Sequence, residues 1–438
     1  MNDMTIVIRS LRVRLLTSSM TVAMVAIAVA LLLVIMSMRE AASQAFRRGT
    51  GNVHLLVCAD ASPLVGVLNG MFYANAPANP IAWTKAEEIR ASFPWQWAIP
   101  TQLGDSFQGS PVMATRSSFL SQFEPVVGQP FTFAAGRAFT SDFEVVAGSQ
   151  AAKEHGLSAG DEIVFTHGSG ASRAGGHEHA DHPYSVVGIL NPTGSAHDRA
   201  LFTSLESSWI IHAEERREAQ STEPEGEEPH EHHEGEHDHA HVDVDDLTDA
   251  DKLITGILLR LPTRPGSDAS ASIASQFDRL RRDTAITVAQ PAQQIGRLMS
   301  IVGDVDWLFL AMGVVVLVSS AISIMLAMIA SMELRRRQVA VLRVLGASAW
   351  RVFALTVTES TLIGLVGSFL GATIALGGCE LASAILADRI GIMVAGTIDL
   401  RSMAMVTLGA VLLSSLAGIT PAIKSYRTSV ARHLRPIA

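Results

Sequence analysis

The sequence lacks the features typical of a disulfide-stabilised domain, of an ATPase, and of an enzyme or nucleic-acid-binding protein. It has two cysteines, Cys58 and Cys379, so no disulfide framework is available and any external domain must be held by its core. No Gly-x-x-x-x-Gly-Lys-Ser/Thr loop occurs, so the chain lacks the phosphate cradle needed to hydrolyse ATP. The spacing supports no Ser-His-Asp or paired-carboxylate arrangement, and no basic footprint for nucleic acid is present. We therefore expect neither an enzyme site nor a catalytic cofactor nor a nucleic-acid partner.

Charge is also sparse where the chain is most apolar. Hydrophobic residues make up 48% of the 438 residues, and they concentrate in four long runs. Three of these runs carry no charged residue, and the third along the chain, residues 352–379, is interrupted only by Glu359. Each run exceeds the roughly 20 residues that cross about 30 Å of hydrocarbon. We predict transmembrane helices at residues 15–38, 307–332, 352–379 and 402–423.

The arginines set the expected orientation. Arg335, Arg336 and Arg337 follow the second run, and Lys424 and Arg427 follow the fourth. Positive residues favour the cytoplasmic side. The first run is too long for a cleaved signal and reads as an uncleaved anchor. We predict a bacterial inner-membrane protein with both termini cytoplasmic, divided into residues 1–38, a periplasmic domain at 39–306 and a membrane core at 307–438.

The periplasmic segment alternates short strands with helices. Strands are expected at residues 144–148, 162–166, 184–190 and 255–261, and helices at 150–155 and 269–282. Residues 213–250 are rich in Glu, Asp, His and Gln, so this stretch should form a disordered or loosely helical loop. The predicted fold class is an α-helical membrane protein of four transmembrane helices with an inserted α+β periplasmic domain. Trp83, Trp95 and Trp97 are expected in its core or at an interface.

Histidines gather in two tracts of this segment. Imidazole nitrogens suit zinc, copper and nickel, and the interleaved carboxylates add oxygen ligands. A flexible tract has no fixed tetrahedron, so several interchangeable sites of modest affinity are expected. A charged low-complexity loop that binds metal incidentally remains the alternative. The candidate ligands for zinc or a similar divalent metal are His177, His179, His182, His230, His232, His233, His237, His239 and His241.

A family resemblance lies in the segment after the second run. Residues 332–348 read Met-Glu-Leu-Arg-Arg-Arg-Gln-Val-Ala-Val-Leu-Arg-Val-Leu-Gly-Ala-Ser, and Glu359-Ser360 follows. Together with residues 420–435, this segment resembles the permease subunits of the FtsX/MacB-type ABC transporter family. The order of one helix, a large external domain and three helices also fits, whereas the His-rich insertion departs from the pattern. The resemblance implies a permease dimer working on a separate cytosolic ATPase.

The resemblance also assigns roles to individual residues. It implies contact with the ATPase, or a hinge, at Glu333, Arg336, Arg337, Gly346 and Ala347. The residues alone predict an amphipathic surface helix that ends at Gly346, and Ser348 is expected to cap the next helix. Anchoring to membrane lipids is an alternative explanation for the arginines of the amphipathic helix. Gly364, Gly367 and Gly371 permit close helix packing, either within the chain or in a dimer.

Three functions remain open from the sequence. The first is a mechanically driven permease in zinc or other divalent-metal handling, with a periplasmic metal-binding protein as partner. The second is export or extraction of a lipoprotein, a peptide or a small molecule. The third is a non-transporting transmembrane regulator of a periplasmic enzyme such as a cell-wall hydrolase. The spans contain few ionisable residues, which argues against a metal-conducting pore.

Overall fold

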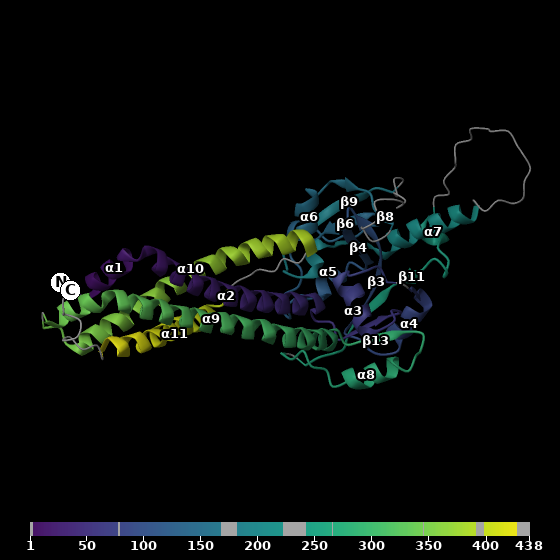
Figure 1. Cartoon of the computed structure of the whole chain (residues 1–438). Coiled ribbons are helices and arrows are strands. Elements are labelled where there is room, and N and C mark those ends of the chain that lie inside the picture. Colours follow the sequence, from purple (N-terminus) through teal and green to yellow (C-terminus); the bar gives the residue numbers. More distant parts are fainter. Residues whose placement is uncertain are drawn as a thin grey trace, which may run out of the picture. The chain divides into compact units, whose positions relative to one another are not determined.

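The computed structural model describes residues 3–77, 79–167, 182–221, 242–264, 266–344, 346–390 and 398–426. Its contacts divide the chain into two compact units. The helical unit comprises Met1–Ala42, Ser300–Leu386 and Val394–Ala438, and the sheet unit comprises Ser43–Met299 with Ala387–Met393. Figure 1 labels the helices α1 to α11 and some of the strands.

The helical unit is built from long apolar helices. A short helix, α1, precedes α2, and α9, α10 and α11 follow the sheet unit in the chain. Their bounds are α1 Asp3–Val13, α2 Leu15–Thr50, α9 Pro291–Val344, α10 Ala349–Ile390 and α11 Leu400–Tyr426. Within the described residues, four stretches are long and apolar enough to cross a membrane, namely Leu15–Thr50, Trp307–Ala330, Ala349–Ser383 and Leu400–Lys424. The predicted set of four membrane helices is thus confirmed.

The core of the helical unit draws on all four long helices. Val29 and Leu33 of α2 are fully buried, and Ile324 of α9, Ala375 of α10 and Ala410 of α11 lie in the same cluster. Large apolar side chains on the outside of the bundle remain exposed, among them Trp307, Phe309, Phe369 and Leu408. An apolar exterior around a packed interior is what a hydrocarbon solvent requires.

In the described residues of the sheet unit, 11 strands form a mixed sheet. Its main path runs β13-β1-β12-β3-β4-β10-β6-β9-β5, with β7 paired to β9 and β8 to β3. Most neighbours are antiparallel, but β10–β4 and β6–β9 are parallel. The strands are β1 Leu55–Cys58, β3 Trp97–Phe107, β4 Ser110–Thr115, β5 Phe133–Gly136, β6 Glu144–Ala147, β7 Glu162–Ile163, β8 Thr166–His167, β9 Tyr184–Leu190, β10 Leu201–Ser204, β12 Gly256–Arg260 and β13 Thr287–Ala289, and a separate pair joins β2 Ile81–Ala82 to β11 Leu253–Ile254.

Helices cover both faces of this sheet. Leu56 points into one core, and its neighbours Leu55 and Val57 point into another, as strand alternation requires. The first core contains α3, and the second contains α4, α7 and α8. The helices of this unit are α3 Pro63–Phe72, α4 Trp83–Ala91, α5 Phe119–Gln122, α6 Ser149–His155, α7 Leu205–Ser221 and α8 Ile273–Leu280, with 3-10 turns η1 Ala196–Arg199 and η2 Val244–Asp246. The predicted inserted α+β domain is confirmed.

Three expectations about local structure need correction. The strand expected at 162–166 is two short strands, because β7 pairs with β9 while β8 pairs with β3. The loop expected at 213–250 is partly ordered: α7 continues to Ser221 with Ala213 fully buried, and Val242 and Leu247 belong to the second core. The amphipathic segment after the second span is not a separate helix, since α9 runs unbroken to Val344.

Candidate functional site

The turn between α9 and α10 is the segment on which the coupling residues were predicted. Glu333, Arg336 and Arg337 lie in the last turns of α9, before the helix ends at Val344. Gly346 has a φ of +94°, a conformation that glycine adopts without strain. Ser348 then caps α10, because its Oγ accepts the backbone N–H of Arg351 at 3.2 Å. Gly346 is exposed and Ala347 is half-buried in this connection between the two helices.

The N-terminal helix is tied to the start of α10 by two polar contacts. Arg351 Nε lies 3.1 Å from Asp3 Oδ1, an exposed pair. Deeper in the unit, Ser10 Oγ donates to Glu359 Oε1 at 2.9 Å, and Glu359 is 6% exposed. Glu359, the single charge in the third predicted span, thus accepts a hydrogen bond from α1.

Three glycines of α10 lie at helix crossings within one chain. A Cβ at Gly367 would stand 2.7 Å from the Val25 Cβ of α2, and one at Gly371 would stand 2.6 Å from the Ala26 carbonyl oxygen. A Cβ at Gly364 would stand 2.5 Å from the Ser414 side chain of α11. At these distances the neighbouring helices contact the α10 backbone directly. The single chain thus packs closely at all three positions, and a role for them in a dimer stays a prediction.

The last turn of α2 is anchored in the sheet unit by a buried histidine. His197 of η1 donates through Nε2 to the Gly49 carbonyl oxygen at 3.1 Å, and its Nδ1 lies 2.6 Å from the Tyr73 hydroxyl, which donates to it. The rings of Phe119, Phe123 and others surround it. Burial lowers the pKa of His197 to about 4, so the imidazole is neutral at pH 7.

The residues around His197 hold its position. Asp198 accepts the backbone N–H groups of Thr193 at 2.8 Å and of Gly194 at 2.7 Å, which fixes the loop before η1. Arg48 of α2 donates to the Thr193 carbonyl at 3.2 Å. Desolvation raises the pKa of Asp198, whereas the hydrogen bonds from Thr193 and its neighbours oppose that shift. The end of α2 and the loop therefore form one hydrogen-bonded joint.

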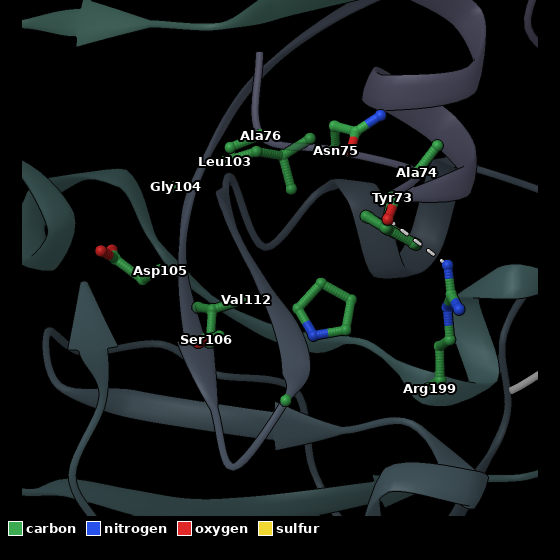
Figure 2. A pocket seen from close by; sticks show the side chains of 12 residues that line it. Tyr73, Ala74, Asn75, Ala76, Leu103, Gly104, Asp105, Ser106, Val112 and Arg199 are labelled. Carbon is green, nitrogen blue, oxygen red and sulfur yellow. Dashed lines mark hydrogen bonds between the residues drawn. The ribbon is translucent and has the colours of Figure 1, made fainter. Parts of the chain in front are cut away.

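A cavity of about 280 Å³ lies beside this joint. Its wall includes Tyr73, Gly104, Asp105 and Arg199, which Figure 2 draws together with the other lining residues. Arg199 Nη2 donates to the carbonyl oxygens of Phe72 at 2.7 Å and of Tyr73 at 3.4 Å. Tyr73, in a left-handed conformation at φ 58°, is both the end of α3 and the partner of His197. Sequence reasoning missed Tyr73 and Arg199, since no motif marks them.

Most of the predicted metal ligands lie outside the described residues. Of the nine, the structure describes only His182, whose Nε2 lies 2.7 Å from Glu214 Oε2 of α7. The other carboxylate oxygen of Glu214 accepts the backbone N–H of Val242 at 3.0 Å. Across the described part of the chain, no three His, Cys, Asp or Glu side chains are grouped as a metal site.

The histidines without motif spacing are hydrogen-bonded where their side chains are described. His54 donates to the Asp268 carbonyl oxygen at 2.9 Å and accepts from the Leu261 N–H at 3.0 Å. His155 lies 2.8 Å from the Ser110 hydroxyl, and His212 lies 3.4 Å from Asp105. Hydrogen bonds and polar contacts thus hold these three histidines in place within the sheet unit.

Comparisons with known proteins identify the class. The model of the MacB-like periplasmic core domain matches residues 18–257, and that of the FtsX-like permease C-terminal region matches residues 310–430. The chain belongs to the FtsX/MacB-type ABC transporter permease family, a membrane protein with a periplasmic domain. Among curated proteins none matches significantly. One similar solved structure is the extracellular domain of the noncanonic ABC-type transporter YknZ from Gram-positive bacteria, at 7% identity and a TM-score of 0.26, covering 49% of this chain and 96% of that one.

Proposed function

We propose that this permease couples a separate cytosolic ATPase to motion of its periplasmic domain. The proposal rests on the packing of two helix ends. The C-terminal end of α2 and the N-terminal end of α9 both pack against the same core of the sheet unit. Phe46 of α2 packs against that core, and so do Ile295, Leu298 and Met299 in the first turns of α9. A displacement of either helix would therefore act on the core of the domain rather than on a loose linker.

The joint at the end of α2 supports the same function. Gly49 is buried against Phe72, whose ring carbon Cε1 would lie 2.3 Å from any added Cβ. The Gly49 carbonyl receives the His197 bond, and Asn52, just past the helix, donates to the Gln122 carbonyl at 3.0 Å. Packing and directional hydrogen bonds together resist both sliding and rotation of the helix end.

On the cytoplasmic side, we assign ATPase contact to Glu333, Arg336, Arg337, Gly346 and Ala347. This assignment places both chain termini in the cytoplasm of a bacterial cell and takes the working unit as a permease homodimer on an ATPase dimer. It rests on family membership, on the glycine turn after α9 and on the absence of a nucleotide-binding loop from the sequence.

The test is ATP hydrolysis by the purified complex with its cognate ATPase in nanodiscs. The double substitution Arg336→Glu, Arg337→Glu should abolish permease-dependent stimulation, because charge reversal repels a contact that the native arginines favour. The matched control is Arg281→Glu, Arg282→Glu, an exposed arginine pair in the sheet unit. Stimulation that survives the first double substitution as fully as the second would refute the assignment.

We further propose that the system handles zinc or a similar divalent metal, together with a periplasmic metal-binding protein. The specific support is Glu214, which contacts His182, the last histidine of one tract, and Val242, the residue that follows the other tract. One carboxylate thus holds the borders of both tracts at the same point of α7. The ligands would be His177, His179, His182, His230, His232, His233, His237, His239 and His241.

Growth in zinc-depleted medium tests this second proposal. The strains carry the intact gene, a deletion of the gene, or a gene lacking residues 230–241, with protein levels matched. Failure of both mutants, rescued by added zinc, supports metal acquisition through the tract. Normal growth of both mutants rejects it and favours lipoprotein, peptide or small-molecule export, or control of a cell-wall hydrolase.

A further inference from the structure

The cavity beside Tyr73 exists because β3 leaves its regular pairing with β4. The register of the two strands shifts between Leu103 and Ser106, so Gly104 and Asp105 have no cross-strand partner on β4. Asp105 pairs instead with β8 on the other side. A Cβ added at Gly104 would meet no atom within 4 Å. The bulge and the missing side chain together open the space next to Arg199.

The charge on the cavity wall is uneven. Arg199 is half-buried, and the carbonyls of Phe72 and Tyr73 hold its guanidinium in place. Asp105 is the acidic residue of the wall, but Figure 2 shows its carboxylate on the far side of β3 from Arg199. There it lies 3.4 Å from His212 Nε2. The Asp105 carboxylate therefore points away from the Arg199 guanidinium.

The remaining wall is partly apolar. Leu103 and Val112 are buried side chains of β3 and β4, and Pro111 adds a ring. The volume of about 280 Å³ lies near the small end of ligand pockets, which begin at roughly 300 Å³. Guanidinium groups recognise carboxylates by charge-assisted hydrogen bonds, and apolar walls accept an aliphatic side chain. We propose that this cavity binds a small organic carboxylate with an aliphatic body, free or as the C-terminal residue of a peptide.

The site adjoins the joint that anchors α2. The Tyr73 carbonyl accepts from Arg199, and the Tyr73 hydroxyl donates to His197, which in turn donates to Gly49. Two side chains thus connect the cavity with the last turn of α2. Ligand binding at this site is independent of the ATPase, so its test stands apart from the tests of the proposed function.

The experiment uses the full chain in nanodiscs and ligand-observed NMR titration. The probes are N-acetyl-leucine, its neutral amide N-acetyl-leucinamide, a pentapeptide ending in leucine, and inorganic phosphate. Gly104→Leu fills the cavity without a clash at Cβ, and Arg199→Gln removes the charge. Gly296→Leu is the matched control, because its Cβ also meets no atom and the position is exposed on α9.

The proposal predicts that N-acetyl-leucine binds about tenfold or more tightly than its amide. Gly104→Leu and Arg199→Gln should both lose this binding, while Gly296→Leu keeps it. Tighter binding of the pentapeptide identifies a peptide C-terminus, and equal binding identifies a free acid. Equal affinity for acid and amide, equal affinity for phosphate, or full binding by Gly104→Leu would overturn the proposal.

Discussion

Replacing Gly371 by alanine tests whether α10 is packed against α2 as closely as the structure indicates. The added Cβ would stand 2.6 Å from the Ala26 carbonyl oxygen and 2.8 Å from the Val29 Cβ. Both are fixed parts of α2, so the helices must separate, and overpacking of this kind costs about 1–3 kcal/mol. Alanine also favours the helix over glycine by about 0.5–1 kcal/mol. The net expectation is a loss of up to about 2.5 kcal/mol.

Gly377→Ala separates these two effects. Gly377 lies on the same helix, but a Cβ there would meet no atom within 4 Å. This variant should gain the helix-propensity term alone, so the difference between the two variants isolates the overpacking cost. Unfolding in mixed detergent micelles, followed by circular dichroism, gives both free energies. Equal stability of the two variants would refute the intrachain crossing at Gly371 and leave dimer packing as its role.

Three further outcomes are expected. Burial lowers the pKa of His197 to about 4, below its value of about 6.5 in the unfolded chain, so the neutral histidine's contribution to the free energy of unfolding is complete above pH 6.5 and falls by about 3 kcal/mol as pH drops toward 4. Denaturant unfolding of His197→Asn should therefore show a weaker pH dependence of stability. An unchanged pH dependence would count against the buried neutral histidine. Ser10→Ala should cost about 1 kcal/mol by removing the bond to Glu359, whereas no loss in a thermal unfolding scan would show that the bond contributes nothing. Asp3→Ala should leave the thermal unfolding midpoint essentially unchanged, since its pair with Arg351 is exposed, and a clear drop in the midpoint would contradict a surface role.

The membrane helices could be predicted because a charge-free run longer than the bilayer core has few alternatives. Their ends could not, since α2 continues to Thr50 and α9 begins at Pro291, where packing against the sheet core replaces lipid. The strand at 184–190 was predicted with its correct bounds because its side chains alternate between the two faces. The strand at 162–166 was not, because the change of partner from β9 to β3 leaves no mark in a five-residue pattern.

The candidate sites divide in the same way. The glycine turn and the packing glycines were conspicuous because only a residue without a Cβ readily adopts a positive φ or lets two helices approach so closely. The joint at His197 could not, because its partners Tyr73 and Gly49 are 124 and 148 positions away along the chain. Such contacts depend on the sheet topology, which brings η1 beside α3 and the end of α2. The His tracts were conspicuous in the sequence, and their metal ligands stay a prediction.

The end of α2 places a buried carbonyl beside position 197, and this carbonyl needs a side chain that donates a hydrogen bond. The last carbonyls of a helix lack intrahelical partners, and the carbonyl of the buried Gly49 is removed from bulk solvent. An apolar residue would leave this carbonyl unsatisfied at a cost of about 1–3 kcal/mol. A charged donor would need to be desolvated among the phenylalanine rings, at greater cost. A neutral histidine avoids both costs, because Nε2 donates to the helix while Nδ1 accepts from Tyr73. The same two hydrogen bonds fix the direction of the end of α2. The histidine that satisfies the buried carbonyl therefore also makes this joint suited to transmitting a displacement of α2 to the sheet unit.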